Sequence, residues 1–124
     1  MATSTKVTPP IHERETVLAW RTRPGGETIK GGETKNLATI DTAGFDKIRL
    51  VCDERVGSTC NVQVRLTFME GTELVAFLDT LMLTPHAQAT RVFDIPGTKL
   101  EVAIDAVGAS PTHGTVDVLI YGQY

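Results

Sequence analysis

The feature that most constrains this chain is a ten-residue segment in which apolar and polar side chains strictly alternate. From Cys60 to Phe68 every second side chain is apolar, and the side chains between them are polar: Asn61, Gln63, Arg65 and Thr67. Side chains of a β-strand point alternately to opposite faces, so this segment predicts a strand with one buried and one solvent-facing side. Antiparallel sheets commonly have this asymmetry, which favours an all-β fold.

Further segments read as strands, separated by turn-forming Gly and Pro at intervals of about ten residues. They are 16–22, 37–41, 45–53, 73–83, 89–95, 99–107 and 115–121. With 60–69 they make eight strands, or nine if 73–83 bends near Asp79 and splits. Thr, Val and Ile account for 37 of the 124 residues, and these β-branched side chains fit a sheet better than a helix. Residues 73–83 are apolar on both faces, which predicts a strand covered on both sides.

Eight or nine antiparallel strands in one short chain predict a two-sheet antiparallel β-sandwich of jelly-roll-like type. A seven-stranded immunoglobulin-like sandwich is disfavoured because Trp20 precedes both cysteines, whereas that fold has a Cys, Trp, Cys order. The alternating pattern, which ends in Val-Asp-Val-Leu-Ile-Tyr-Gly at 116–122, resembles many jelly-roll modules. These include carbohydrate-binding modules and small phage capsid-decoration or tail proteins. The resemblance covers the fold pattern only, and no functional residue is carried over from it.

The chain divides into an extended N-terminal arm, residues 1–15, and a single β-sandwich domain, residues 16–124. The arm is polar, and Pro9-Pro10 favours extended polyproline geometry. Residues 1–35 hold six Lys and Arg against four Glu (+2), and residues 36–124 hold six against eleven acidic residues (−5). A basic-leaning leading segment can dock on the acidic body of a neighbouring copy, although an ordinary solvated surface would carry the same charges. The residues assigned to this assembly arm are Lys6, Pro9, Pro10 and Arg14.

A short duplication follows the first predicted strand, with Gly-Gly-Glu-Thr at 25–28 and again at 31–34. Two glycine pairs six residues apart predict a flexible hairpin or an ordered bulged loop over 25–35. The spacing matches neither a phosphate loop nor a dinucleotide-binding fingerprint. We expect this segment to be mobile or ordered by a partner.

The two cysteines, Cys52 and Cys60, stand at facing ends of two predicted strands. If those strands form a hairpin, the two side chains could approach disulfide distance. The alternative is a pair of buried free thiols that act as small hydrophobes. No zinc site is expected, since no further His or Cys stands nearby to complete one.

Residues able to support catalysis are few. None of the three serines lies in a Gly-x-Ser-x-Gly elbow. The three histidines, His12, His86 and His113, fall in separate loops or termini. Asp105 and Asp117 lie on outward faces of two strands that could pair, where a solvated sheet face explains them better than a glycosidase cleft. The sequence therefore predicts a non-enzymatic protein with no catalytic residues, no metal and no cofactor.

Two functions fit these observations. The first is a structural or assembly protein that forms a homo-oligomer or a shell component, for example of a phage capsid-decoration or tail type. The alternative is a carbohydrate- or other ligand-binding module of jelly-roll type, which would use Trp20, Tyr121 and Tyr124 as a platform. The net charge of −3 is unsuited to nucleic acid, and no stretch approaches the roughly twenty apolar residues of a membrane span. With no signal-peptide pattern, a cytoplasmic or virion location is expected.

Overall fold

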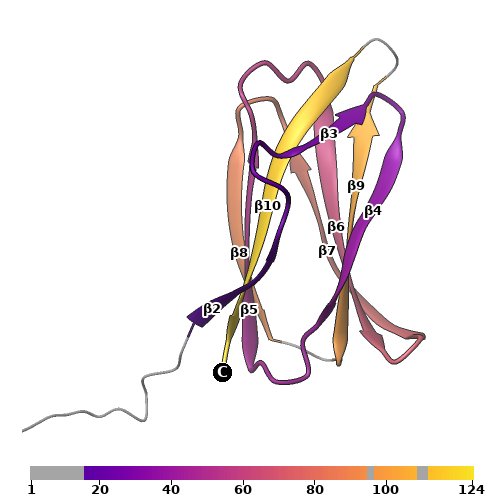
Figure 1. Cartoon of the computed structure of the whole chain (residues 1–124). Helices are drawn as coiled ribbons and strands as arrows, with labels where there is room; N and C mark the ends of the chain where they lie inside the picture. Colours follow the sequence, from indigo (N-terminus) through magenta and orange to yellow (C-terminus); the bar gives the residue numbers. More distant parts are fainter. Residues whose placement is uncertain (1–15, 95–96, 109–111) are drawn as a thin grey trace, which may run out of the picture.

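The computed structural model describes residues 16–94, 97–108 and 112–124, without the side chains of 74–79. Its described residues form nine β-strands in two facing antiparallel sheets (Figure 1). The first sheet has the order β2 (Thr16–Arg21), β10 (His113–Gln123), β5 (Lys47–Glu54) and β8 (Gln88–Asp94), and β3 (Glu27–Lys30) also pairs with β10. The second has the order β4 (Thr34–Asp41), β9 (Lys99–Val107), β6 (Asn61–Glu70) and β7 (Glu73–Leu83). The prediction of a two-sheet antiparallel sandwich with eight or nine strands is confirmed. The predicted arm lies outside the described residues.

The chain winds back and forth between the two sheets. From β3 onward, every connection except the β6–β7 hairpin passes from one sheet to the other. As a result the last strand, β10, lies inside the first sheet, with β2 and β3 on one side and β5 on the other. This order is consistent with the jelly-roll-like form of the prediction.

The core fills the space between the sheets and follows the period-two pattern. In β6 the side chains of Val62, Val64, Leu66 and Phe68 are completely buried, as the alternation predicts. Burying one such side chain contributes about 1.5–3 kcal/mol to folding. The facing sheet contributes Leu50 and other buried side chains to the same cluster, namely Ile29, Ile48, Cys52, Val116, Val118 and Ile120.

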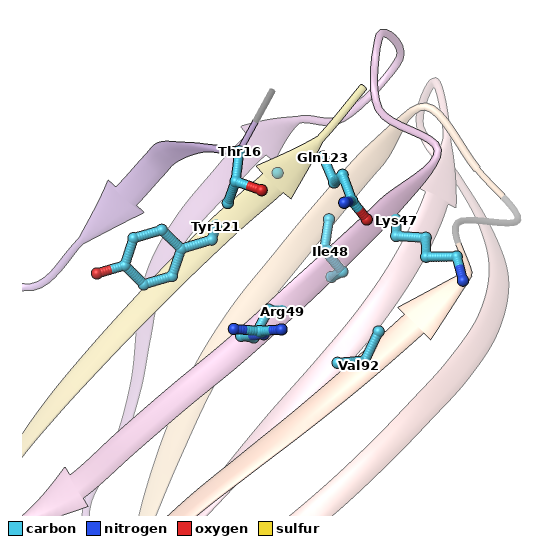
Figure 2. A pocket seen from close by; sticks show the side chains of 8 residues that line it. Thr16, Lys47, Ile48, Arg49, Val92, Tyr121 and Gln123 are labelled. Atoms are coloured by element: carbon cyan, nitrogen blue, oxygen red, sulfur yellow. The ribbon is translucent and has the colours of Figure 1, made fainter. Parts of the chain in front are cut away.

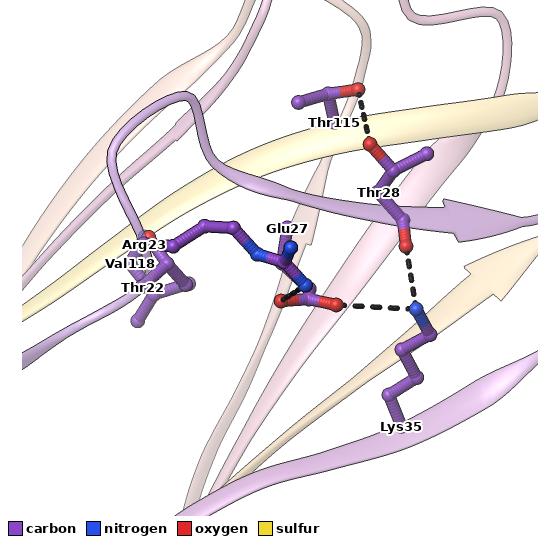
Figure 3. Close-up of polar contacts among 7 residues, drawn as sticks. All are labelled: Thr22, Arg23, Glu27, Thr28, Lys35, Thr115 and Val118. Carbon is purple, nitrogen blue, oxygen red and sulfur yellow. Dashed lines mark hydrogen bonds and ion pairs between the residues drawn. The ribbon is translucent and has the colours of Figure 1, made fainter.

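The glycine-rich segment 25–35 contains a paired strand, so the expectation of a mobile or partner-ordered loop is wrong. The two glycine pairs flank β3, whose four residues pair with β10, and Gly26 (φ +86°) and Gly32 (φ +83°) have the left-handed backbone that glycine tolerates best. Lys35 Nζ donates to the Thr28 carbonyl at 2.8 Å and approaches a Glu27 carboxylate oxygen at 3.2 Å (Figure 3). The segment is thus held by contacts within the chain.

The strand β7 is less covered than the sequence predicted. It runs unbroken from Glu73 to Leu83, but it forms an edge of the second sheet, with only β6 as a neighbour. At its described end Leu81 and Leu83 are buried while Met82 is 50% exposed, so one face there is open to solvent. Within the described residues, no helix is long and apolar enough to cross a membrane.

Candidate interaction surface

The outer face of the first sheet carries a row of side chains that crosses four of its five strands. The ladder places Leu18 of β2, Tyr121 of β10, Arg49 of β5 and Val92 of β8 side by side. Figure 2 shows Tyr121, Arg49 and Val92 on three neighbouring strands. Leu18 is 48% exposed and Val92 is 54% exposed. We call these four residues the outer row.

A shallow depression lies along this row. Tyr121, Arg49 and Val92 line it together with Thr16 and Gln123. Its volume is about 40 Å³, which accommodates a few water molecules rather than a sugar ring. The surface is therefore close to flat, and its shape suits another protein surface better than an enclosed small molecule.

The outer face of the second sheet carries a group of polar side chains that are paired with one another. The carboxylate of Asp105 accepts hydrogen bonds from Thr34 Oγ1 at 2.6 Å and from Arg65 Nε at 2.7 Å. Burial would raise the pKa of Asp105, but the hydrogen bonds from Thr34 and Arg65 and the Arg65 charge outweigh it and hold the pKa below its ordinary value. These groups satisfy each other, although Met82 and Val107 on the same face are 50% and 45% exposed.

The three aromatic residues predicted to form a sugar platform do not gather on one face. Trp20 pairs with the completely buried Ile120 and packs, half-buried, against the core. Tyr121 lies on the opposite side of the sheet, in the outer row. Tyr124 is 50% exposed beyond the end of β10, with its ring centroid 5.0 Å from that of Phe45. Of the three, only Tyr121 belongs to the outer row.

The predicted hairpin between the cysteine-bearing strands is absent. Cys52 lies on β5 in the first sheet, and Cys60 immediately precedes β6 in the second sheet. Both are buried and neither is disulfide-bonded. Burial raises the pKa of Cys52 to about 11 and also raises the pKa of Cys60, so both thiols stay protonated at neutral pH.

A polar hollow of about 510 Å³ lies at the β5–β6 end of the first sheet. Asp53, Arg55, His86 and Asp117 contribute to its lining. Arg55 Nε donates to Asp117 Oδ2 at 2.6 Å, and the residue Asp117 is only 7% exposed. Asp117 is therefore less exposed than the predicted solvated face implies. The strands of Asp105 and Asp117, β9 and β10, do not pair because they belong to different sheets.

A carboxylic acid is buried beneath this end of the sandwich. Glu54, the last residue of β5, continues the inward-facing series of Leu50 and Cys52 and is completely buried. Neither of its carboxylate oxygens has a hydrogen-bond partner. Burial raises the pKa of Glu54, and the nearby Val62 amide and Ser58 hydroxyl oppose that rise only in part. The sequence prediction ended the strand at Asp53 and missed this residue.

Three further expectations concern the assembly arm, the basic leading segment and metal binding. The assembly-arm residues, Lys6, Pro9, Pro10 and Arg14, lie outside the described residues. Among the described basic residues of the leading segment, Arg21, Lys30 and Lys35 lie on strands of the sandwich. Lys35 approaches Glu27 at 3.2 Å, and Arg21 lies 3.9 Å from Asp117. In the described ranges, no group of three or more His, Cys, Asp or Glu could hold a metal ion.

Comparison with known proteins gives a likeness in fold only. No protein-family model matches the chain, and no curated protein matches it. One similar solved structure is a chain from Bacillus endospore appendages, described as disulfide-linked pili, with a TM-score of 0.47 and 11% identity. The match covers 95% of this chain and 96% of that one. The two chains are therefore similar in length, and a match of this closeness carries no argument about function.

Proposed function

We propose that this chain is a non-catalytic structural subunit that associates with copies of itself. It would serve as a component of a homo-oligomer or of a larger protein shell. The observation that carries the proposal is the outer row, where Leu18, Tyr121 and Val92 place apolar surface in line across the whole first sheet. An apolar line on a nearly flat sheet suits a protein–protein contact.

The alignment of exposed apolar side chains on the two outer faces supports the same proposal. On the second sheet, the cross-strand row that holds Met82 continues into the polar Gln63 and Asp105. On the first sheet, Leu18 and Val92 each leave about half of their surface in water. Covering an exposed apolar side chain stabilises a contact by about 25 cal/mol for each Å² removed from water. Self-association through the first sheet would therefore cover the apolar side chains of one row together.

Sedimentation velocity over a wide range of concentrations tests the proposal. We expect the mass to rise in multiples of 13.4 kDa and to fall in Leu18→Ser. The matched control is Met82→Ser, because Met82 is 50% exposed on the second sheet, close to the 48% of Leu18. A monomer at every concentration would overturn the proposal, and an equal effect of both variants would remove the outer row from it. Deletion of residues 1–15 in the same assay asks whether the arm contributes.

A ligand-binding module remains the second candidate, and the polar hollow favours it. The hollow is lined by acidic residues together with Arg55 and His86, so its ligand would be polar. Glycan-array binding that is lost in Asp53→Ala would favour a sugar at this site. Unchanged binding would direct the search to Tyr121 on the outer row.

A further inference from the structure

The four edges of the sandwich are not equivalent. A sheet edge presents unpaired backbone N–H and C=O groups to which another strand can bind, and bulges or breaks obstruct this. The edge formed by β2 and β3 is broken at residues 22–26. The edge strands β4 and β7 both pair with their neighbours through register shifts, one in β4 and two in β7. The short β3 pairs without a shift over four residues, and β8 does so over all seven of its residues.

The hydrogen bonds along β5 identify which groups of β8 face outward. The Glu54 amide donates to the Ala87 carbonyl, and the Arg55 amide donates to the Thr115 carbonyl of β10. Because backbone groups alternate in direction along a strand, even-numbered residues of β5 bond toward β8. Their partners in the ladder are Ala89, Arg91 and Phe93.

The other residues of β8 therefore turn their amide and carbonyl groups to the free edge. These residues are Gln88, Thr90, Val92 and Asp94. The hydrogen bond that the Thr90 carbonyl accepts from Arg91 Nη1 at 2.9 Å agrees with this direction. Gln88, Thr90, Val92 and Asp94 are all exposed.

We propose that β8 of one copy pairs antiparallel with β8 of a second copy about a two-fold axis at Val92. The proposal rests on the self-association proposed above and adds a second contact at the edge of the same sheet, which leaves the outer rows free for the face contact. The second copy is the fitting partner because its own uninterrupted edge is again β8. Such a pair joins two first sheets into one continuous sheet and aligns the two outer rows through their Val92 ends.

Charge and side-chain type select the register. Outward-facing residues must oppose outward-facing residues, so the axis can lie at Thr90, Arg91 or Val92. An axis at Arg91 sets two guanidinium groups directly opposite each other, which is destabilising. An axis at Val92 sets valine against valine, Arg91 against Phe93 and Thr90 against Asp94. An axis at Thr90 sets Gln88 against the exposed Val92 and leaves Phe93 and Asp94 without partners in β8, whereas an axis at Val92 leaves only the smaller Ala89 and the polar Gln88 without them.

Cysteine cross-linking tests the register directly. In a hydrogen-bonded antiparallel pair, opposite Cα atoms lie about 5.5 Å apart, which is within disulfide range. We expect Val92→Cys to form a disulfide-linked dimer under mild oxidation. Thr90→Cys is the matched control, because the two Thr90 residues would lie four positions apart, or roughly 13 Å. Faster cross-linking of Thr90→Cys than of Val92→Cys would overturn the register.

Two further variants test the contact without a cross-link. Val92→Pro removes one outward amide and leaves the ladder to β5 intact, and Val92→Lys places like charges at the axis. Each should raise the dimer dissociation constant roughly tenfold or more, whereas Val56→Lys, on a loop residue that is 82% exposed, should not. An oligomer that both variants leave unchanged would overturn the edge pairing but keep the proposed function. A wild-type monomer at all concentrations would overturn both.

Discussion

Replacing Glu54 with Gln should stabilise the protein, and the gain should grow with pH. Glu54 is completely buried and neither carboxylate oxygen has a hydrogen-bond partner. Burial raises its pKa, so from about pH 4.3 upward the folded protein retains this proton more strongly than the unfolded chain does. Gln has nearly the same shape and carries no proton to lose, so the variant removes this linkage and leaves the packing intact.

The size of the effect follows from the linkage. Between the ordinary pKa of Glu and its raised pKa in the fold, wild-type stability falls by about 1.4 kcal/mol for each pH unit. At pH values below that window, the free energies of unfolding of the wild type and of Glu54→Gln differ by a constant amount. Above the window they differ by a larger constant amount. By pH 7 the change cannot exceed roughly 4 kcal/mol, because the window begins near pH 4.3.

Urea unfolding at a series of pH values measures this difference. The free energies of unfolding of the wild type and of Glu54→Gln should diverge as pH rises above about 4.3. Glu70→Gln is the matched control, because Glu70 is also the last residue of a strand but is exposed. Parallel curves for the wild type and Glu54→Gln throughout this range would refute the idea that a buried, protonated acid sits at the end of β5.

Three more predictions follow from individual contacts. Gly122→Ala should lower stability by about 1–3 kcal/mol, because a Cβ there would overlap the ring of Phe45, whereas at Gly44 it would meet only an ordinary contact at 3.6 Å. Thermal unfolding of Gly122→Ala beside Gly44→Ala checks this, and equal melting temperatures would contradict it. Asp105→Asn should lower the free energy of unfolding by about 1 kcal/mol or less at pH 7. Because the pKa of Asp105 is lowered in the fold, this loss should shrink as the pH falls below the ordinary pKa of Asp. A loss in chemical denaturation that stays constant down to acid pH would argue against this. Lys35→Met should speed amide hydrogen exchange in β3, because it removes the hydrogen bond from Lys35 Nζ to the Thr28 carbonyl at 2.8 Å. Unchanged exchange would show that the strand does not need this hydrogen bond.

The sequence was sufficient to predict the sheets because their signal is local. Period two in 60–69 and 99–107 identifies most of the buried side chains, and from Val62 to Phe68 only Thr67, predicted to face solvent but 6% exposed, departs from it. The glycine-rich segment was misjudged because β3 is stabilised by β10, which is about ninety residues away in sequence. A four-residue strand has too few side chains to show a period of its own.

The candidate surface was harder to predict, because it depends on which strands become neighbours. The outer row draws one residue from each of four strands, and no spacing in the chain reveals that Leu18, Tyr121 and Val92 share a line. The cysteine hairpin failed for the same reason, since consecutive strands β5 and β6 lie in different sheets. A continued alternation from Leu50 through Cys52 was the one local signal that could have placed Glu54 in the core.

The central place of β10 also affects how the protein is made. During synthesis the strands β2, β3 and β5 leave the ribosome early, yet each of them pairs with β10. Until residues 113–123 emerge, the backbone groups of these strands that pair with β10 have no partner, and the first sheet is incomplete. The nascent chain therefore depends on protection from aggregation until nearly all of this sandwich has been synthesised.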